Sequence, residues 1–315
     1  MMKIDTNIAH AAECLKAGQL VAMPTETVYG LAANACDDMA IERVYAAKGR
    51  PSHNPLIIHV AHTKMAQTLV EWNEAAELLS HTYWPGPLTM VLKRRAGCPI
   101  SKLASAGLET LAIRVPAHPI AQQLLAACAL PLAAPSANLS GCVTATSAQH
   151  VAADFAGKDV TILEAGPTTI GLESTVIDIT HDTPQLLRPG SITHHQLEAT
   201  LGTPVMRMGD NNISPASPGM LTSHYAPKAK LRLNATHVED EEALLAFGKP
   251  LEGAVTTINL SEQGDIAEAS SHLFAALRDM DAKGATHIAV MPIPNEGIGE
   301  ALNDRLQRAA APKQS

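Results

Sequence analysis

The stretch AAKGRPSHNPLIIHV, residues 46–60, joins the end of a helix to the start of a strand. The preceding DDMAIERVYAAK places apolar residues at helical spacing, which predicts a helix with Lys48 in its last turn and Gly49 as its C-cap. The closing LIIHV is a short apolar run, typical of a buried strand. A helix that leads directly into a buried strand indicates an α/β sheet with a polar loop at one end.

That loop carries two cations. Lys48 would complement the dipole at the helix C-terminus, which needs no functional explanation. Arg50 lies between Gly49 and Pro51, where the chain is extended and stiff, so it projects from a fixed loop. A cation held in this way favours an anionic ligand.

Strands and helices alternate on either side of this stretch. We expect helices near 7–17, 74–82 and 118–128, strands at 87–93 and 111–115, and a hairpin of STVIDIT (174–180) with PQLLRPG (184–190). This order predicts an α/β fold with an open sheet of mixed direction over residues 1–202. Residues 203–228 contain four prolines and no sustained periodicity, which predicts a linker. Two strands and two helices within 229–315 predict a smaller α/β domain.

Composition narrows the class of protein. The 315 residues are 46% hydrophobic but only 3% aromatic, so aliphatic side chains must fill the core. The formal charge of −8 disfavours a general nucleic-acid binder. Five cysteines without a CxxC pair disfavour a zinc site and a disulfide framework, and predict reduced packing residues. No run is long enough to span a membrane and no signal peptide is evident, so we expect a soluble cytoplasmic protein.

Five polar loops bounded by Gly or Pro are expected to converge at one edge of the sheet. They are PTETVYG (24–30), KGRPSHNP (48–55), APSANLSG (134–141), GPTTIGLEST (166–175) and LRPG (187–190). Their hydroxyls, amides and cations favour anionic, oxygen-rich ligands. His53, His59 and His62 lack the spacing of a metal site, and Ser136 and Ser140 lie in no GxSxG motif.

Arg114 interrupts the apolar strand LAIRV and therefore needs an anionic partner. That partner could be Glu109 or Glu173, or the carboxylate of a substrate. Arg188, within LRPG, presents the same two alternatives.

Eight motifs together resemble the YrdC family in its long, two-domain form, over roughly residues 20–228. They are PTETVYGLA, AKGRPSHNPL, WPGPLT, LAIRVP, APSANLSG, GPTTIGLESTVID, LLRPGSI and SPGMLTSHYAP. The tail IGEALNDRLQRAA is similar to the end of the family's C-terminal domain, whereas Ala32 stands where members often have a second Gly. The resemblance implies a YrdC-like twisted mixed sheet followed by a smaller Rossmann-like domain.

It also implies a nucleotidyltransferase that makes threonylcarbamoyl-AMP and pyrophosphate from L-threonine, bicarbonate or CO2, and ATP. This is the first step of N6-threonylcarbamoyladenosine formation at position 37 of tRNAs that read ANN codons. Mg2+ would accompany ATP without a protein-held metal site. A downstream threonylcarbamoyl-transferase complex would be a partner, and tRNA a candidate partner.

The motif matches assign roles to individual residues. Lys48 and Arg50 would hold the triphosphate as catalytic residues, and Tyr225 would fold back from the linker as part of a lid. The expected L-threonine contacts are Thr27, His59, Arg114, Ala134 and Ser174; the expected ATP contacts are Arg50, Asn54, Thr110, Ser136, Thr144, Arg188 and Tyr225.

Two other functions remain open from the sequence. A basic face with Lys48, Arg50, Lys93, Arg94 and Arg95 would make the chain an RNA-binding module. A hydrogenase-maturation carbamoyltransferase contains a related domain, but the zinc-finger cysteines of those proteins are not found here.

Overall fold

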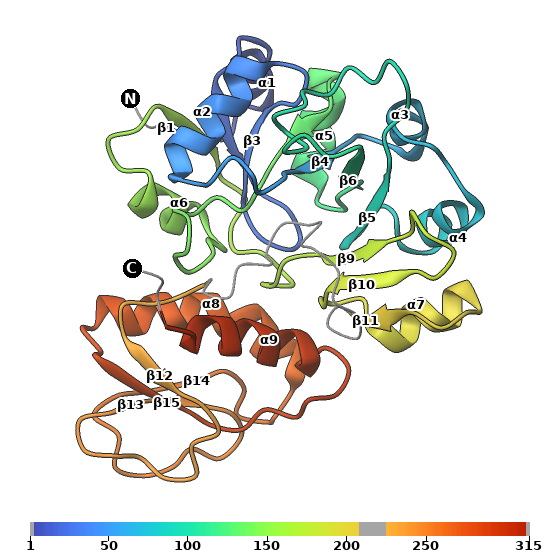
Figure 1. Cartoon of the computed structure of the whole chain (residues 1–315). Helices are drawn as coiled ribbons and strands as arrows, with labels where there is room; N and C mark the ends of the chain where they lie inside the picture. The colour runs from blue at the N-terminus through green and yellow to red at the C-terminus, as the bar shows by residue number, and fades with distance from the viewer. Residues whose placement is uncertain (1–2, 208–224, 313–315) are drawn as a thin grey trace.

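The larger of two sheets organises the first two thirds of the chain (Figure 1). The computed structural model describes residues 3–207 and 225–312. Within these residues the sheet has eleven strands of mixed direction. In spatial order they are β1 (Lys3–Asp5), β8 (Val160–Leu163), β2 (Leu20–Met23), β3 (Gly30–Asn34), β7 (Leu132–Ala133), β4 (Ile57–His59), β6 (Thr110–Arg114), β5 (Leu88–Lys93), β9 (Thr175–Asp178), β10 (Gln185–Arg188) and β11 (Met206–Arg207).

Helices cover the two faces of this sheet unequally. Successive strand residues point to opposite faces, so in β2 Leu20 and Ala22 join one core cluster while Val21 and Met23 join another. The first cluster is covered by α2 (Asp38–Lys48), α3 (Thr63–Leu69), α4 (Glu74–Tyr83), α6 (Ala148–Asp154) and α7 (His194–Leu201). Among the described residues, the second is covered by α1 (Ile8–Lys16) and α5 (Pro119–Cys128), which pack beside β8, β2, β3 and β7. Within residues 3–207 and 225–312, no helix packs on the same face of β4 and β6.

The opening stretch folds as its sequence predicts. The side chain of Asp37 accepts hydrogen bonds from the first turn of α2, and Gly49 ends the helix with a left-handed φ of 61°. The hairpin of β9 and β10 is antiparallel, as expected. The short elements β7, α3 and α6 have no clear periodic signal and were not predicted.

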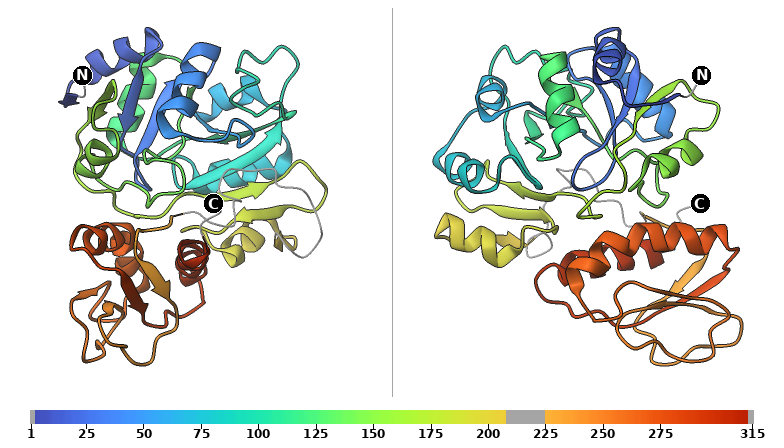
Figure 2. Two further views of the ribbon diagram at one scale, coloured as in Figure 1. Left: turned by 60° about the vertical axis from the view of Figure 1, so that its left-hand side comes forward. Right: turned by 180° about the vertical axis from the view of Figure 1, so that it is seen from behind.

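A four-stranded parallel sheet forms the smaller unit. Its order is β12 (Lys230–Arg232), β15 (His287–Val290), β13 (Ala243–Ala246) and β14 (Thr257–Asn259). The helices α8 (Ile266–Ala282) and α9 (Gly299–Ala310) lie between this sheet and the larger unit (Figures 1 and 2). Most of the expected linker, with the motif SPGMLTSHYAP up to His224, falls outside the described residues.

Loops of the larger unit are docked into the core of the smaller one. Val28, Val143 and Leu172 are buried in the same apolar cluster as the inner faces of α8 and α9. Gly171 approaches α8 so closely that a Cβ there would lie 2.6 Å from the backbone oxygen of Ser270. The two units therefore share a packed interface beside the polar loops. Among the described residues, no helix has both the length and the apolarity needed to cross a bilayer.

Candidate active site

A cavity lies against the face of β4 and β6 opposite the one that α2, α3, α4, α6 and α7 pack on. Ile57, His59 and Arg114 face this cavity, whereas Ile58 and Ile113 face the helices on the other side. The described lining residues are Thr25, Thr27, Val28, Gly30, Arg50, Ile57, His59, Arg114, Ala134, Pro135, Ser136, Glu173, Ser174, Arg188 and Tyr225. The polar loops thus meet over a face of the sheet rather than along one edge.

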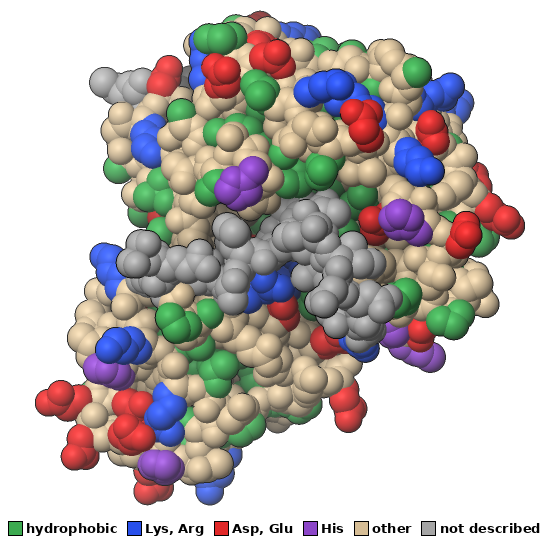
Figure 3. Space-filling view, in the orientation of Figure 1, with side chains coloured by type: hydrophobic (Ala, Val, Ile, Leu, Met, Phe, Trp, Pro, Cys, Tyr) green, Lys and Arg blue, Asp and Glu red, His purple; other side chains and the backbone are tan. Residues whose placement is uncertain are grey.

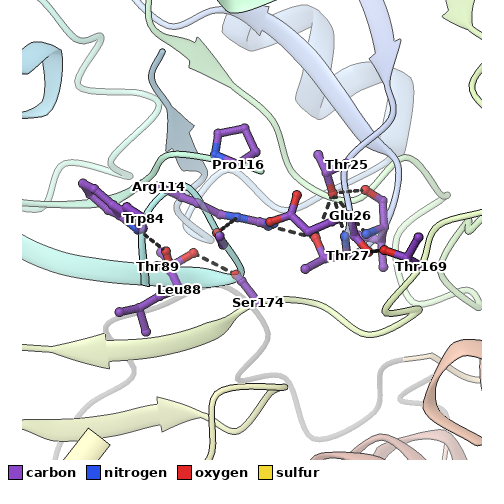
Figure 4. A network of polar contacts seen from close by, with 12 residues as sticks. Thr25, Glu26, Thr27, Trp84, Leu88, Thr89, Arg114, Pro116, Thr169 and Ser174 are labelled. Atoms are coloured by element: carbon purple, nitrogen blue, oxygen red, sulfur yellow. Dashed lines mark hydrogen bonds and ion pairs between the residues drawn. The ribbon is translucent and has the colours of Figure 1, made fainter. Parts of the chain in front are cut away.

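Arg114 is fixed at one end of the cavity by three different groups. Its Nη2 donates to Glu26 Oε1 at 2.6 Å, Nη1 donates to Thr27 Oγ1 at 2.8 Å, and Nε donates to the carbonyl of Gly86 at 3.1 Å. Figure 4 shows Arg114 directed at the loop that carries Glu26 and Thr27. The ion-pair partner is therefore Glu26, not Glu109 or Glu173 as the sequence alternatives proposed. Glu109 pairs instead with Lys102 on the surface.

Local chain geometry places these partners. Thr25 Oγ1 donates to the Val28 carbonyl at 2.6 Å and accepts from the Thr27 and Val28 amides, which makes a tight turn. The turn presents Glu26 and Thr27 toward Arg114. On the other side, a Cβ at Gly86 would lie 2.2 Å from the carbonyl of Tyr83, so this close approach requires glycine.

Burial and the Arg114 charge act in opposite directions on Glu26. Burial raises the pKa of its carboxyl, but the charge and hydrogen bond of Arg114 lower it by more. The net pKa is therefore below the usual 4.5. Glu26 Oε2 has no hydrogen-bond partner among the described residues. Nη1 and Nη2 of Arg114 each carry two N–H groups, and Thr27 and Glu26 accept one bond from each nitrogen, so one N–H on each remains. A ligand carboxylate can therefore still be bound on its cavity side.

Arg50 and Arg188 provide positive charge elsewhere in the cavity. Arg50 donates to the carbonyls of Asn54 and Pro55 at 3.3 and 3.1 Å, and Arg188 donates to the carbonyl and Oγ of Ser174 at 3.0 and 3.1 Å. Burial lowers the pKa of Arg50 to about 10 and also lowers that of Arg188. Both remain charged near neutral pH. Within the described residues, neither guanidinium contacts a carboxylate. The ion pair that the sequence offered as one alternative for Arg188 is therefore not formed among them.

His59 lies deep in the same cavity, beside Arg114 in the parallel pairing of β4 with β6. Burial, reinforced by the Arg114 charge, lowers the pKa of its imidazole from 6.5 to about 3. The ring is therefore neutral near pH 7. Its Nδ1 has no hydrogen-bond partner among the described residues, which leaves that nitrogen to a ligand.

Tyr225 and Glu173 line the side of the cavity nearest the smaller unit. Tyr225 is 1% exposed, and its ring packs 5.4 Å from that of Phe274 in α8, centroid to centroid. Burial, reinforced by the Glu173 charge, raises the pKa of its phenol to about 12, so the hydroxyl stays protonated. Glu173 Oε1 accepts a hydrogen bond from Thr144 Oγ1 at 2.8 Å, and Oε2 accepts from Arg305 Nε at 3.1 Å.

Four predicted contact residues lie outside the described cavity wall: Lys48, Asn54, Thr110 and Thr144. Lys48 does not present its ammonium to the cavity as expected; it is buried, and Nζ donates to the carbonyls of Ser136 and Asn138 at 2.5 Å each. Thr110 begins β6 and lies about 13 Å along that strand from Arg114, at the strand's other end. Direct contacts from Asn54, Thr110 and Thr144 remain predictions.

Three polar residues near the cavity were assigned no part in binding from the sequence: Thr25, which lines it, and the carboxylates Glu26 and Glu173. Each lies inside a polar loop that was singled out, so the loops gave a signal but the individual carboxylates did not. Among residues 3–207 and 225–312, no group of three or more His, Cys, Asp and Glu side chains is arranged to hold a metal ion. Cys14 and Cys128 are buried as expected, whereas Cys142 is exposed.

Two family models match the chain. The model described as "Telomere recombination" (Sua5, YciO, YrdC) matches residues 13–190, and that described as "Threonylcarbamoyl-AMP synthase, C-terminal domain" matches residues 192–311.

Among similar proteins, a threonylcarbamoyl-AMP synthase of Bacillus subtilis is 41% identical, over 97% of this chain and 93% of its own length. One from Schizosaccharomyces pombe is 34% identical, over 92% of this chain and 85% of its own. A crystal structure of Pyrococcus abyssi Sua5 complexed with L-threonine is 37% identical, with a TM-score of 0.90, and covers 98% of this chain and 97% of that one.

Proposed function

The chain belongs to the Sua5/YciO/YrdC family in its two-domain form, and from this membership we infer that it is a threonylcarbamoyl-AMP synthase. It is an enzyme, a nucleotidyltransferase of the pathway that modifies tRNA with threonylcarbamoyladenosine. We propose that its substrates are L-threonine, bicarbonate or CO2, and ATP, and its products threonylcarbamoyl-AMP, pyrophosphate and water.

The observation that carries this proposal is a single cavity with cations from separate elements. Arg114 lies beside the neutral His59, and this pair suits a small amino acid whose carboxylate meets the guanidinium. Arg50 and Arg188 line the same cavity, and their described hydrogen bonds are all to neutral groups. Two cations without a described anionic partner suit a polyphosphate.

The reaction requires alignment and charge neutralisation more than a protein nucleophile. The threonine amine and bicarbonate give a carbamate and water. A carbamate oxygen then bonds to the α-phosphorus of ATP, and the bond from that phosphorus to the bridging oxygen of pyrophosphate breaks. Fixed arginines stabilise the negative charge that develops on the leaving pyrophosphate, and binding both substrates in one cavity lowers the entropic cost of their encounter.

We assign the contacts accordingly. For L-threonine they are Thr27, His59, Arg114, Ala134 and Ser174; for ATP they are Arg50, Ser136, Arg188 and Tyr225, with Asn54, Thr110 and Thr144 as further candidates. Lys48 acts on the phosphates through the backbone: its ammonium holds the carbonyls of Ser136 and Asn138 and so shapes the loop that lines the cavity.

Magnesium enters with ATP as part of the substrate. The one carboxylate among the described lining residues, Glu173, is already engaged by Thr144 and Arg305, so phosphate oxygens and water are the expected ligands. We propose the division into a catalytic domain (1–202), a connecting segment (203–228) and a C-terminal domain (229–315). The unstable product would pass to a downstream threonylcarbamoyl-transferase complex.

The RNA-binding alternative has little support on the surface. Lys48 and Arg50 are buried, and Arg94 and Arg95 donate to backbone carbonyls of neighbouring loops. On the face shown in Figure 3, Lys and Arg side chains are interspersed with Asp and Glu rather than gathered into one stripe.

The test is to incubate the full chain with ATP, Mg2+ and labelled bicarbonate, with and without L-threonine. Pyrophosphate release and a labelled AMP conjugate should both require threonine. Pyrophosphate without the labelled conjugate, or neither, would reject the proposed reaction. RNA affinity without turnover, falling steeply with salt, would favour the alternative.

A further inference from the structure

Arg305 lies on α9 of the smaller unit and is completely buried at its interface with the larger one. A buried guanidinium is costly unless it is paired and hydrogen-bonded. Nε donates to Glu173 Oε2 at 3.1 Å, and Nη1 donates to Asp304 Oδ2 at 2.7 Å. Nη2 has no partner among the described residues. Because burying this charge is costly and an apolar side chain could fill the same volume, the contact of Arg305 with Glu173 across the interface suggests a specific role.

Glu173 connects Arg305 to the wall of the cavity. Its two carboxylate oxygens accept from different units: Oε1 from Thr144 of the larger unit and Oε2 from Arg305 of the smaller one. A shift of the Glu173 side chain would therefore disturb Thr144, one of the candidate ATP contacts, and the part of the cavity wall that Glu173 itself forms.

Arg305 also supports Tyr225. Its Cζ lies 5.6 Å from the centroid of the Tyr225 ring, within the range of a cation–π interaction. Phe274 of α8 packs against the same ring, so side chains of both interface helices fix the phenol. Tyr225 has a φ of 65°, uncommon for a residue with a Cβ, and this backbone must be held by its surroundings.

The loop before Glu173 has little freedom to compensate. Leu172 is fully buried in the core of the smaller unit, and Gly171 lies against the backbone of α8. Glu173 is thus held from both sides: by the docked loop through its backbone and by Arg305 through its carboxylate.

We propose that Arg305 is a positioning residue for the nucleotide half of the cavity. From the smaller unit it holds Glu173 and the Tyr225 ring in place, so that the smaller unit forms part of the ATP site. This rests on the proposed function for the identity of the ligand. Arg114 and His59, at the threonine end, receive no contact from Arg305, so the effect should be specific to the nucleotide.

Arg305→Lys tests this in the full chain, because lysine keeps the charge but loses the planar donors that reach Glu173 and Asp304 together. Arg308→Lys is the matched control: Arg308 lies one turn further on α9 and donates to the same Asp304, at 2.9 Å, but no contact to Glu173 is described. Binding of α,β-methylene-ATP and of L-threonine is measured separately by titration calorimetry.

Arg305→Lys should weaken binding of the ATP analogue about tenfold, a usual size for coupling between sites, and change threonine binding less than about twofold. In turnover, the KM for ATP should rise while kcat changes little. Arg308→Lys should leave both affinities near those of the wild type. Unchanged nucleotide affinity, or equal losses for both ligands, would overturn the proposal.

If Arg305→Lys does not fold, Glu173→Gln is measured instead, because it removes the charge that Arg305 pairs with and keeps the shape. A nucleotide-specific loss supports the proposal and unchanged nucleotide affinity refutes it. If the wild-type chain turns over and Arg305→Lys has unchanged nucleotide affinity, this inference alone is defeated. A wild-type chain without threonine-dependent turnover defeats the proposed function.

Discussion

Replacing Arg114 with alanine should weaken L-threonine binding far more than ATP binding. The guanidinium is buried and held by Glu26, Thr27 and the Gly86 carbonyl, so it meets a ligand carboxylate without having to be ordered first. Hydrogen bonds to a charged group contribute about 1.5–3 kcal/mol. At about 1.4 kcal/mol for each factor of ten, the Kd for threonine should rise roughly 10- to 150-fold. The Kd for α,β-methylene-ATP should change less than about threefold.

The same substitution leaves the Glu26 carboxylate buried without its cation. Breaking a buried ion pair in this way costs about 3–5 kcal/mol, so Arg114→Ala should also lower the Tm. The double variant Glu26→Gln/Arg114→Ala removes the stranded charge and should recover much of that stability without recovering threonine binding. Glu26→Gln alone is the control that keeps the guanidinium.

Titration calorimetry gives the two affinities, and thermal unfolding gives the Tm of each variant. Equal losses for threonine and nucleotide in a folded Arg114→Ala protein would refute the assignment. So would a double variant in which threonine affinity returns together with stability, because the loss would then reflect unfolding rather than a missing contact.

Three further outcomes follow from the geometry. Because the folded-state pKa of Glu26 lies below 4.5, its contribution to stability is present above pH 4.5 and is lost as the pH falls, so the urea midpoint of Glu26→Gln should depend less on pH in that range. Because the pKa of His59 is lowered to about 3, its NMR ring signals should not titrate near pH 6.5; a midpoint near 6.5 would show that the ring is not buried. As the pH is lowered from 6.5, the wild type should lose folding stability more steeply than His59→Gln, because the unfolded His59 binds a proton that the folded one does not. A Cβ at Gly190 would lie 2.4 Å from the Thr175 amide, so Gly190→Ala should cost about 1–3 kcal/mol in denaturant unfolding, whereas the neighbouring Ser191→Ala should cost little.

Local chemistry in the sequence was sufficient for much of the fold. The cap at Gly49, the hairpin of β9 and β10, and the long helices α5, α8 and α9 carry periodicity or turn signals within a single segment. Short elements such as β7 and α6 have too few residues for a period to be read, and tertiary contacts decide them.

The candidate site divides in the same way. Thr27, Arg50, His59, Arg114 and Ser174 were each found from a motif, and all of them line the cavity.

The sequence did not indicate which polar groups contact one another in the site. Which carboxylate meets Arg114, and that Lys48 turns to two backbone carbonyls, depends on contacts between segments 88 and 90 residues apart.

The sequence by itself determined which residue types gather in polar loops and, through its motifs, the family and its chemistry. Only the tertiary structure decided that the loops meet on one face of β4 and β6 and that Arg305 of the smaller unit reaches Glu173. The physical reason is that hydrogen bonds and ion pairs depend on distances of about 3 Å, which packing of the whole chain sets, whereas capping and periodicity act within a few neighbouring residues.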